Sequence, residues 1–325
     1  MRKEETIRLM LKSELFDRWH YFRYHFDFYN RGDVHPLANS IVEAITDIEN
    51  QIPKAGIDYI KKIASLNGKE NDTSHYDQLL QILAELLIVH HSVNYKWKDL
   101  VEINYEPKTV NSKRNPELII KTNTLEIGIE VKAPEFVKKH TERNTKPIQL
   151  PSRSDLIEVL NKDFVMLPRD NPVKDFLISA NKKFAGFKNN NPSFIGVLVV
   201  VWDDFIYEPI SALLSKQCGL FTDNSFAFDA EGNMLKFENV DSVIITRHLY
   251  LIKNGTRDEN LPDMYRHPLD YGINGEFPYK VHINNPNSKL KIPDEVIDCF
   301  QSCEPNPTLG AEYCPIDLVQ WNPEL

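Results

Sequence analysis

The chain has 325 residues, of which 42% are apolar and 26% are charged, and its formal net charge is −9. This composition is typical of a globular protein and argues against a largely disordered chain. No apolar run reaches the roughly 18 residues that a membrane helix needs, and the polar start, MRKEETIRLMLKSE, lacks the apolar core of a signal peptide. We therefore expect a cytoplasmic protein with no membrane partner.

The first part of the chain, residues 1–72, is predicted to be helical and rich in aromatic side chains. Helices are expected near 36–50 and 55–66. The preceding stretch FDRWHYFRYHFDFY places eight aromatic residues between Phe16 and Tyr29. Such a cluster usually forms a core or a dimer contact, and stacking on nucleic-acid bases beside the interleaved arginines is the alternative.

The segment 74–93, SHYDQLLQILAELLIVHHSV, predicts a helix that is apolar nearly all round and is capped by Thr73 or Ser74. Its central polar residues form one narrow stripe at helical spacing: Gln78, Gln81 and Glu85. Because such a helix is covered on most sides, Glu85 either reaches solvent, joins a structural ion pair or faces a metal ion.

The middle of the chain predicts an α/β sheet. Three strand-like runs come in quick succession, the last two joined by a tight turn, at 99–107, 116–122 and 124–134. Further elements are predicted in the order helix, strand, helix and strand, at 172–186, 193–202, 207–218 and 241–252. The fold class is therefore expected to be α/β, with a mixed central sheet flanked by helices.

Nine of the twenty prolines lie after residue 255, which indicates an irregular C-terminal extension and not a second regular core. We expect three regions: an N-terminal helical, aromatic-rich region (1–72), an α/β core (73–255) and the extension (256–325).

The four cysteines are too few for a disulfide scaffold. Cys299, Cys303 and Cys314 could supply three zinc ligands, but the spacing of the first two is loose and no paired fourth ligand stands out. Packing as small apolar side chains is the interpretation that we prefer, and the sequence assigns these cysteines no role.

A basic segment, residues 131–153, carries six lysines and arginines against two glutamates. The acidic net charge argues against indiscriminate binding to phosphates, but it leaves room for a local basic patch. On charge alone, a solvated loop and a contact with phosphate are both compatible with this segment.

Charged residues interrupt the apolar hairpin PELIIKTNTLEIGIEVKAPE. Side chains alternate along a strand, so Glu130 and Lys132 point to the same side, opposite the apolar face. If the apolar faces of both strands coincide, Glu117 approaches Glu130. Two carboxylates held this close repel each other unless a cation lies between them. A divalent metal is the simplest such cation, and Lys132 beside it could orient or deprotonate a water molecule and stabilise a negatively charged transition state.

Two short stretches carry a resemblance: NPEL, which contains Glu117, and IEVKAP, which contains Glu130 thirteen positions later. Together they resemble the PD-(D/E)xK motif of the restriction-endonuclease-like nuclease superfamily. The order of the predicted elements also matches that fold over about residues 73–202. One departure is Glu117, which stands where aspartate is usual. The resemblance implies that Lys132 serves the attacking water, and that Mg²⁺, with Mn²⁺ as a substitute, is held by Glu117, Glu130, the carbonyl of Val131 and, as an additional ligand or organising residue, Glu85.

Two further carboxylates, Asp203 and Asp204, follow the predicted strand at 193–202 and could bind a metal, although capping the next helix is their more ordinary role.

We expect a Mg²⁺-dependent DNA endonuclease of the bacterial restriction or anti-phage type, with RNA as a substrate not excluded by the sequence. A homodimer is the expected assembly, since cutting two strands with one site per chain favours two copies. A partner protein in a defence system is also compatible with the resemblance. The alternative is a catalytically degenerate module that keeps the fold and binds nucleic acid or a partner protein.

Overall fold

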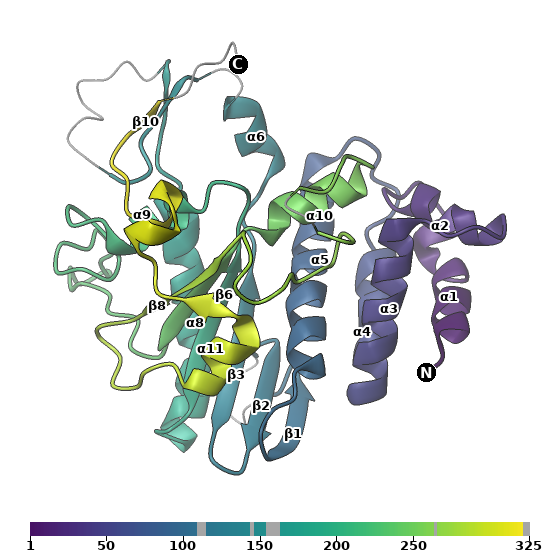
Figure 1. The fold of residues 1–325 in the computed structure, drawn as a ribbon, viewed down its shortest axis with the longest axis horizontal. Coiled ribbons are helices and arrows are strands. Elements are labelled where there is room, and N and C mark those ends of the chain that lie inside the picture. The colour runs from purple at the N-terminus through teal and green to yellow at the C-terminus, as the bar shows by residue number, and fades with distance from the viewer. Residues whose placement is uncertain (109–114, 144–145, 154–162, 263–264, 321–325) are drawn as a thin grey trace.

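The computed structural model describes residues 1–108, 115–143, 146–153, 163–262 and 265–320. The fold is α/β, with one mixed sheet of seven strands between two layers of helices (Figure 1). A search of the described helices found none with the length and apolar character needed to cross a membrane.

The N-terminal region is helical, as predicted. Its helices are α1 (Lys3–Leu11), α2 (Arg23–Asn30), α3 (Pro36–Gln51), α4 (Ala55–Ala64) and α5 (Thr73–Asn94). Helix α5 packs on the sheet, and α3 and α4 pack on α5 (Figure 1). The predicted caps of α5 were wrong: the side chain of Asp72 accepts a hydrogen bond from the N–H of Ser74 at 3.0 Å. In the aromatic stretch, Phe22 and Phe26 are fully buried, which confirms a core role for these two rings.

The main sheet has the strand order β1-β2-β3-β6-β7-β8-β9. Its strands are β1 (Leu100–Tyr105), β2 (Leu118–Thr122), β3 (Glu126–Lys132), β6 (Ile195–Val201), β7 (Ser242–Thr246), β8 (Lys280–Asn284) and β9 (Ser302–Cys303). The first three form the expected antiparallel meander, and β3, β6 and β7 run parallel. Strand β8 is antiparallel to β7, and β9 is parallel to β8. A small second sheet joins β4 (Ile148–Gln149) to β5 (Val165–Met166) and β10 (Val319–Gln320).

Alternation along the strands divides the apolar side chains between two cores, one on each face of the sheet. Ile127 and Ile129 of β3 join the core under α5, whereas Ile119 of β2 joins the core under α8 (Asp170–Asn190) and α9 (Tyr207–Leu214). Within the described residues, the other α-helices are α6 (Val137–Arg143), α10 (His248–Thr256) and α11 (Asp294–Phe300).

Several predicted boundaries were wrong. The strand expected at 241–252 ends at Thr246, and α10 follows, because Leu249 and Ile252 are buried at helical spacing in the core that contains α5. Helix α8 runs past Gly186 to Asn190, since the ring of Phe187 stacks on that of Phe194.

Helix α9 ends at Leu214, before the predicted 218. The chain turns back there, and the N–H groups of Leu220 and Phe221 donate to the carbonyls of Ala212 and Leu213. The C-terminal segment is more regular than predicted, because β8 and β9 extend the main sheet and α11 packs into the core. Within it Cys299 is buried in that core, which agrees with a packing role.

Two glycines allow α8 to approach the sheet closely. Gly128 on β3 and Gly196 on β6 are directly paired. A Cβ atom at Gly128 would lie 2.3 Å from the ring of Phe194, and one at Gly196 would lie 2.7 Å from the ring of Phe184. Because Phe184 belongs to α8, this approach also fixes the height of its neighbour Lys183 above β3.

We expect Gly196→Ala to lower the free energy of unfolding by about 1–3 kcal/mol, because overpacking forces neighbouring groups to shift. A Cβ atom there would also lie 2.4 Å from the backbone carbonyl of Asn239, which cannot rotate away. Urea unfolding measures the change. Lys121→Ala, at an exposed position of β2, is the control and should stay within about 0.5 kcal/mol of the unmodified chain. Equal stability of Gly196→Ala and the control would show that the close packing has no energetic weight.

Candidate metal centre

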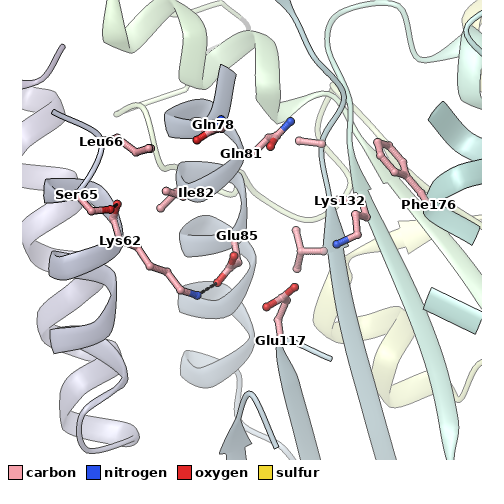
Figure 2. Close-up of a pocket in the computed structure, with 12 residues that line it drawn as sticks. Lys62, Ser65, Leu66, Gln78, Gln81, Ile82, Glu85, Glu117, Lys132 and Phe176 are labelled. Atoms are coloured by element: carbon pink, nitrogen blue, oxygen red, sulfur yellow. Dashed lines mark hydrogen bonds and ion pairs between the residues drawn. The ribbon is translucent and has the colours of Figure 1, made fainter. Parts of the chain in front are cut away.

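A cavity of about 410 Å³ opens where β2 begins and β3 ends, between α4 and α5 on one side and α8 on the other (Figure 2). Four of the five residues predicted for the site line it: Glu85, Glu117, Val131 and Lys132. The fifth, Glu130, is fully buried beside it. The structure therefore brings together every residue that the motif implied.

The sheet itself positions Glu117. Its N–H donates to the carbonyl of Ile129 at 2.9 Å, and its own carbonyl accepts from the N–H of Glu106 at 2.9 Å. The chain at Glu117 is therefore held between β3 and the end of β1. The register pairs Leu118 with Ile129, so Glu117, directly before β2, comes close to Glu130, as the alternation predicts.

The cation between these two carboxylates is an ammonium group. Lys183 of α8 places its Nζ 2.7 Å from Oε1 of Glu130 and 3.5 Å from Oε1 of Glu117. Lys132 adds a second ion pair to Glu130, at 2.6 Å. Lys183 thus lies where the sequence predicts a metal ion, and the metal itself stays a prediction.

The sequence reasoning missed Lys183, although α8 carries a signal for it. Lys183 lies three residues after Ala180 and four before Phe187, both of which are buried. A lysine inside the apolar stripe of a helix needs a partner charge, because burying an unpaired ammonium group is costly.

A second group of carboxylates lies at the cavity. Glu85, Glu106 and Glu117 each offer a carboxylate oxygen, and these oxygens lie within 4.8 Å of one another. Lys62 of α4 reaches Glu85 at 3.1 Å (Figure 2). It also reaches Glu106 at 2.7 Å. The hydroxyl of Tyr59 donates to Glu85 at 2.7 Å. Glu85 therefore has its predicted place, and Glu106 and Lys62 are contributors that the sequence reasoning missed.

Burial and mutual repulsion shape the ionisation of this cluster. Burial, and after it repulsion by the nearby carboxylates Glu85 and Glu130, raises the pKa of Glu117 to about 8 against the lowering effect of Lys183 and Lys132. Burial opposes the charge of Lys183, but Glu130 and Glu117 outweigh it and raise the pKa of that lysine. The pKa of Lys62 is also raised against the effect of burial, chiefly by Glu85.

The donor set suits a hard divalent cation. The three carboxylates of Glu85, Glu106 and Glu117 supply oxygen atoms only, which are the ligands that Mg²⁺ and Mn²⁺ prefer. Repulsion by Glu85 and Glu130 contributes, after burial, to the raised pKa of Glu117, and a cation beside these carboxylates would relieve that repulsion. The residues present thus fit a metal at this position better than at the one occupied by Lys183.

The other predicted carboxylates lie elsewhere. Asp203 is buried with Glu208, and Arg169 places its Nη1 2.7 Å from Asp203 and 3.0 Å from Glu208. Although burial favours the neutral acid, Arg169 and Arg143 lower the pKa of Asp203 to about 2. Neither Asp203 nor its neighbour caps α9, whose N-cap is Ile206, because Asp203 is held by the arginines and Asp204 pairs with Arg247.

Two arginines of the basic segment 131–153 form ion pairs within the fold. Arg143 is buried against Asp203 and Glu208, and Arg153 pairs with Asp170 at 2.7 Å. Arg143 is thus a buried structural residue, whereas Arg153 keeps a side chain that is 42% exposed beside its ion pair. Residues 144–145 of the segment lie outside the described residues.

Comparison of the chain with protein-family models, with curated proteins and with solved structures found no match.

The shifted pKa of Glu117 predicts a pH dependence of stability in metal-free buffer. In the folded chain Glu117 keeps its proton up to about pH 8, whereas in the unfolded chain it loses it near the ordinary value of 4.5. Between these values the folded state binds more protons, so the free energy of unfolding falls as the pH rises through this window. The variant Glu117→Gln cannot ionise and should lack this fall.

Urea unfolding with EDTA at pH 5, 7 and 9 measures the effect. The stability of Glu117→Gln relative to the unmodified chain should rise with pH. Glu4→Gln, on the exposed face of α1, is the matched control and should follow the unmodified chain. Parallel curves for Glu117→Gln and the unmodified chain would contradict the raised pKa.

Proposed function

We propose that this chain is a divalent-metal-dependent nuclease with a restriction-endonuclease-like core, and that DNA is its substrate. The observation that carries the proposal is the convergence of Glu117, Glu130 and Lys132, from two neighbouring strands, with Glu85 of α5 at one cavity. The order α5, β1, β2, β3, α8 and β6, with α6, β4 and β5 inserted between β3 and α8, supports the proposed core. The restriction or anti-phage setting, the homodimer and a partner protein stay predictions from the sequence resemblance.

The residues that would hold the metal are Glu85, Glu106 and Glu117, whose oxygens lie within 4.8 Å of one another, with Val131 lining the same cavity. When bound, Mg²⁺ or Mn²⁺ would supply a Lewis acid that polarises the phosphate and lowers the pKa of a water molecule.

Lys132 has the position of a catalytic residue in this proposal. Its side chain is 25% exposed, lines the cavity and is held at 2.6 Å by the buried carboxylate of Glu130. An ammonium group placed there can orient a water molecule and stabilise the charge that develops on the phosphate during attack. Lys62 lines the cavity as well and adds positive charge toward the same phosphate.

One observation favours a second candidate, a catalytically inactive module that binds nucleic acid or a partner protein. Lys62 and Lys183 already pair with the carboxylates of the cluster. The buried charges are therefore largely compensated without a metal, as a structural cluster requires. Metal binding separates the two candidates.

We expect Lys132→Ala to lower the cleavage rate by at least about 10²-fold, the usual effect of removing an electrostatic or acid–base catalyst. The fold should hold, because Lys132 is the last residue of β3 and is partly exposed. Cleavage of supercoiled plasmid, linear duplex, single strands and RNA is measured with and without Mg²⁺, with Lys121→Ala as the matched control. If Lys132→Ala cuts at the rate of the control, the site is wrong.

We expect Mn²⁺ to stabilise the chain, by about 2.7 kcal/mol when its concentration is 100 times the Kd. Glu85→Gln removes a charged ligand and should weaken this gain, whereas Glu4→Gln should retain it. Unfolding with and without Mn²⁺ measures both variants. Absence of stabilisation by Mn²⁺ and by Mg²⁺ in the unmodified chain would favour the inactive module.

A further inference from the structure

The cavity has a charged end and an uncharged end. Lys62, Glu85, Glu117 and Lys132 form the charged end. Beyond them, Figure 2 shows two glutamines of α5, Gln78 and Gln81, on the same side of the helix as Glu85. The apolar side chains of the cavity include Leu66, Ile82 and Phe176. Metal chemistry needs only the charged end, so the uncharged end requires its own explanation.

The two glutamines are free to bind a ligand. Neither side chain has a hydrogen-bond partner within the described part of the chain, and Gln78 is exposed while Gln81 is half-buried. Along the helix axis Gln81 lies about 6 Å from Glu85 and Gln78 about 10 Å from it, at a rise of 1.5 Å per residue. Each amide offers donors and an acceptor together, which is the combination that pairs with the edge of a nucleobase.

The apolar side chains suit the face of a base. Leu66 from the segment after α4, Ile82 of α5 and Phe176 of α8 are each half-buried at the cavity. Aromatic and apolar side chains receive unstacked bases in single-strand binding proteins, and the contact tolerates any base because every base has a π face. Figure 2 shows Leu66 and Ile82 on one side of Gln81 and Phe176 on the other, so amides for the edge of a base and an apolar side chain for its face are both available at this end of the cavity.

We propose that the uncharged end holds the base of one unpaired nucleotide while its phosphate lies at the charged end, so that the substrate is single-stranded or locally unpaired nucleic acid. This inference rests on the proposed nuclease function for the role of the phosphate. A cavity of about 410 Å³ has the size of a site for a single small ligand, and a duplex does not fit inside it. In a duplex the faces of the bases are stacked, so a base enters such a cavity only after it has left the stack.

The test compares the binding of a fluorescein-labelled 12-nucleotide single strand with that of the matching duplex. Anisotropy is measured in Mg²⁺ in a Lys132→Ala background, which the proposed function makes inactive. The double variant Gln78→Leu, Gln81→Leu removes the amides and retains helix propensity and size. Gln51→Leu is the matched control, because Gln51 is exposed at the end of α3 and does not line the cavity.

The single strand should bind at least about tenfold more tightly than the duplex, and the double variant should lose about tenfold in affinity for the single strand alone, the loss expected for one amide–base pair. The control should bind like its parent. Equal affinity for both ligands, or an equal loss for both in the double variant, overturns the inference.

Hydrolysis of bis(p-nitrophenyl) phosphate in Mg²⁺ by the chain with Lys132 intact tests the phosphodiester chemistry separately, because this diester carries no base. Hydrolysis together with equal binding of single strand and duplex overturns the base site and leaves the nuclease proposal standing. Selective binding of the single strand without hydrolysis of the diester or of any nucleic acid supports the base site and overturns the nuclease proposal.

Discussion

Burial of two carboxylates on neighbouring strands is the constraint that organises this protein. Glu130 is fully buried and Glu117 nearly so, and charges taken out of water are tolerated only when they are paired. The pairing partners come from outside the two strands. Lys183 reaches them because Gly128 and Gly196 let α8 lie close to the sheet, so the packing of a helix and the charge balance of the cluster depend on each other.

The N-terminal helices belong to the same arrangement. Lys62 and Tyr59 of α4 hold Glu85 of α5, which in turn lies beside Glu117. We had described residues 1–72 as a region separate from the α/β core, yet its side chains complete the carboxylate cluster. A substitution in α4 is thus expected to act on the site directly and not only on stability.

Much of the site could be predicted from local periodicity. Alternation along β3 places Glu130 and Lys132 together, and helical spacing places Glu85 in line with the two glutamines. Lys183 and Glu106 were missed because their positions depend on how distant elements pack, which no local pattern records. The same limit explains the segment 241–252, whose apolar residues fit both the strand and the helix period. The pairing of β7 with β6 ends at Thr246, and the chain continues as α10.

In the proposed nuclease, a metal ion that binds the cluster would replace the ammonium group of Lys62 as the partner of its carboxylates. A divalent ion at Glu85 and Glu106 would compete with the ammonium group that holds them at 3.1 and 2.7 Å, and the released lysine already lines the cavity where a phosphate would lie. If the released lysine pairs with the phosphate, this new ion pair offsets the free energy lost when the metal displaces the lysine from Glu85 and Glu106. By thermodynamic linkage the metal then raises the affinity for the phosphate by the same factor, so cofactor and substrate would be bound cooperatively.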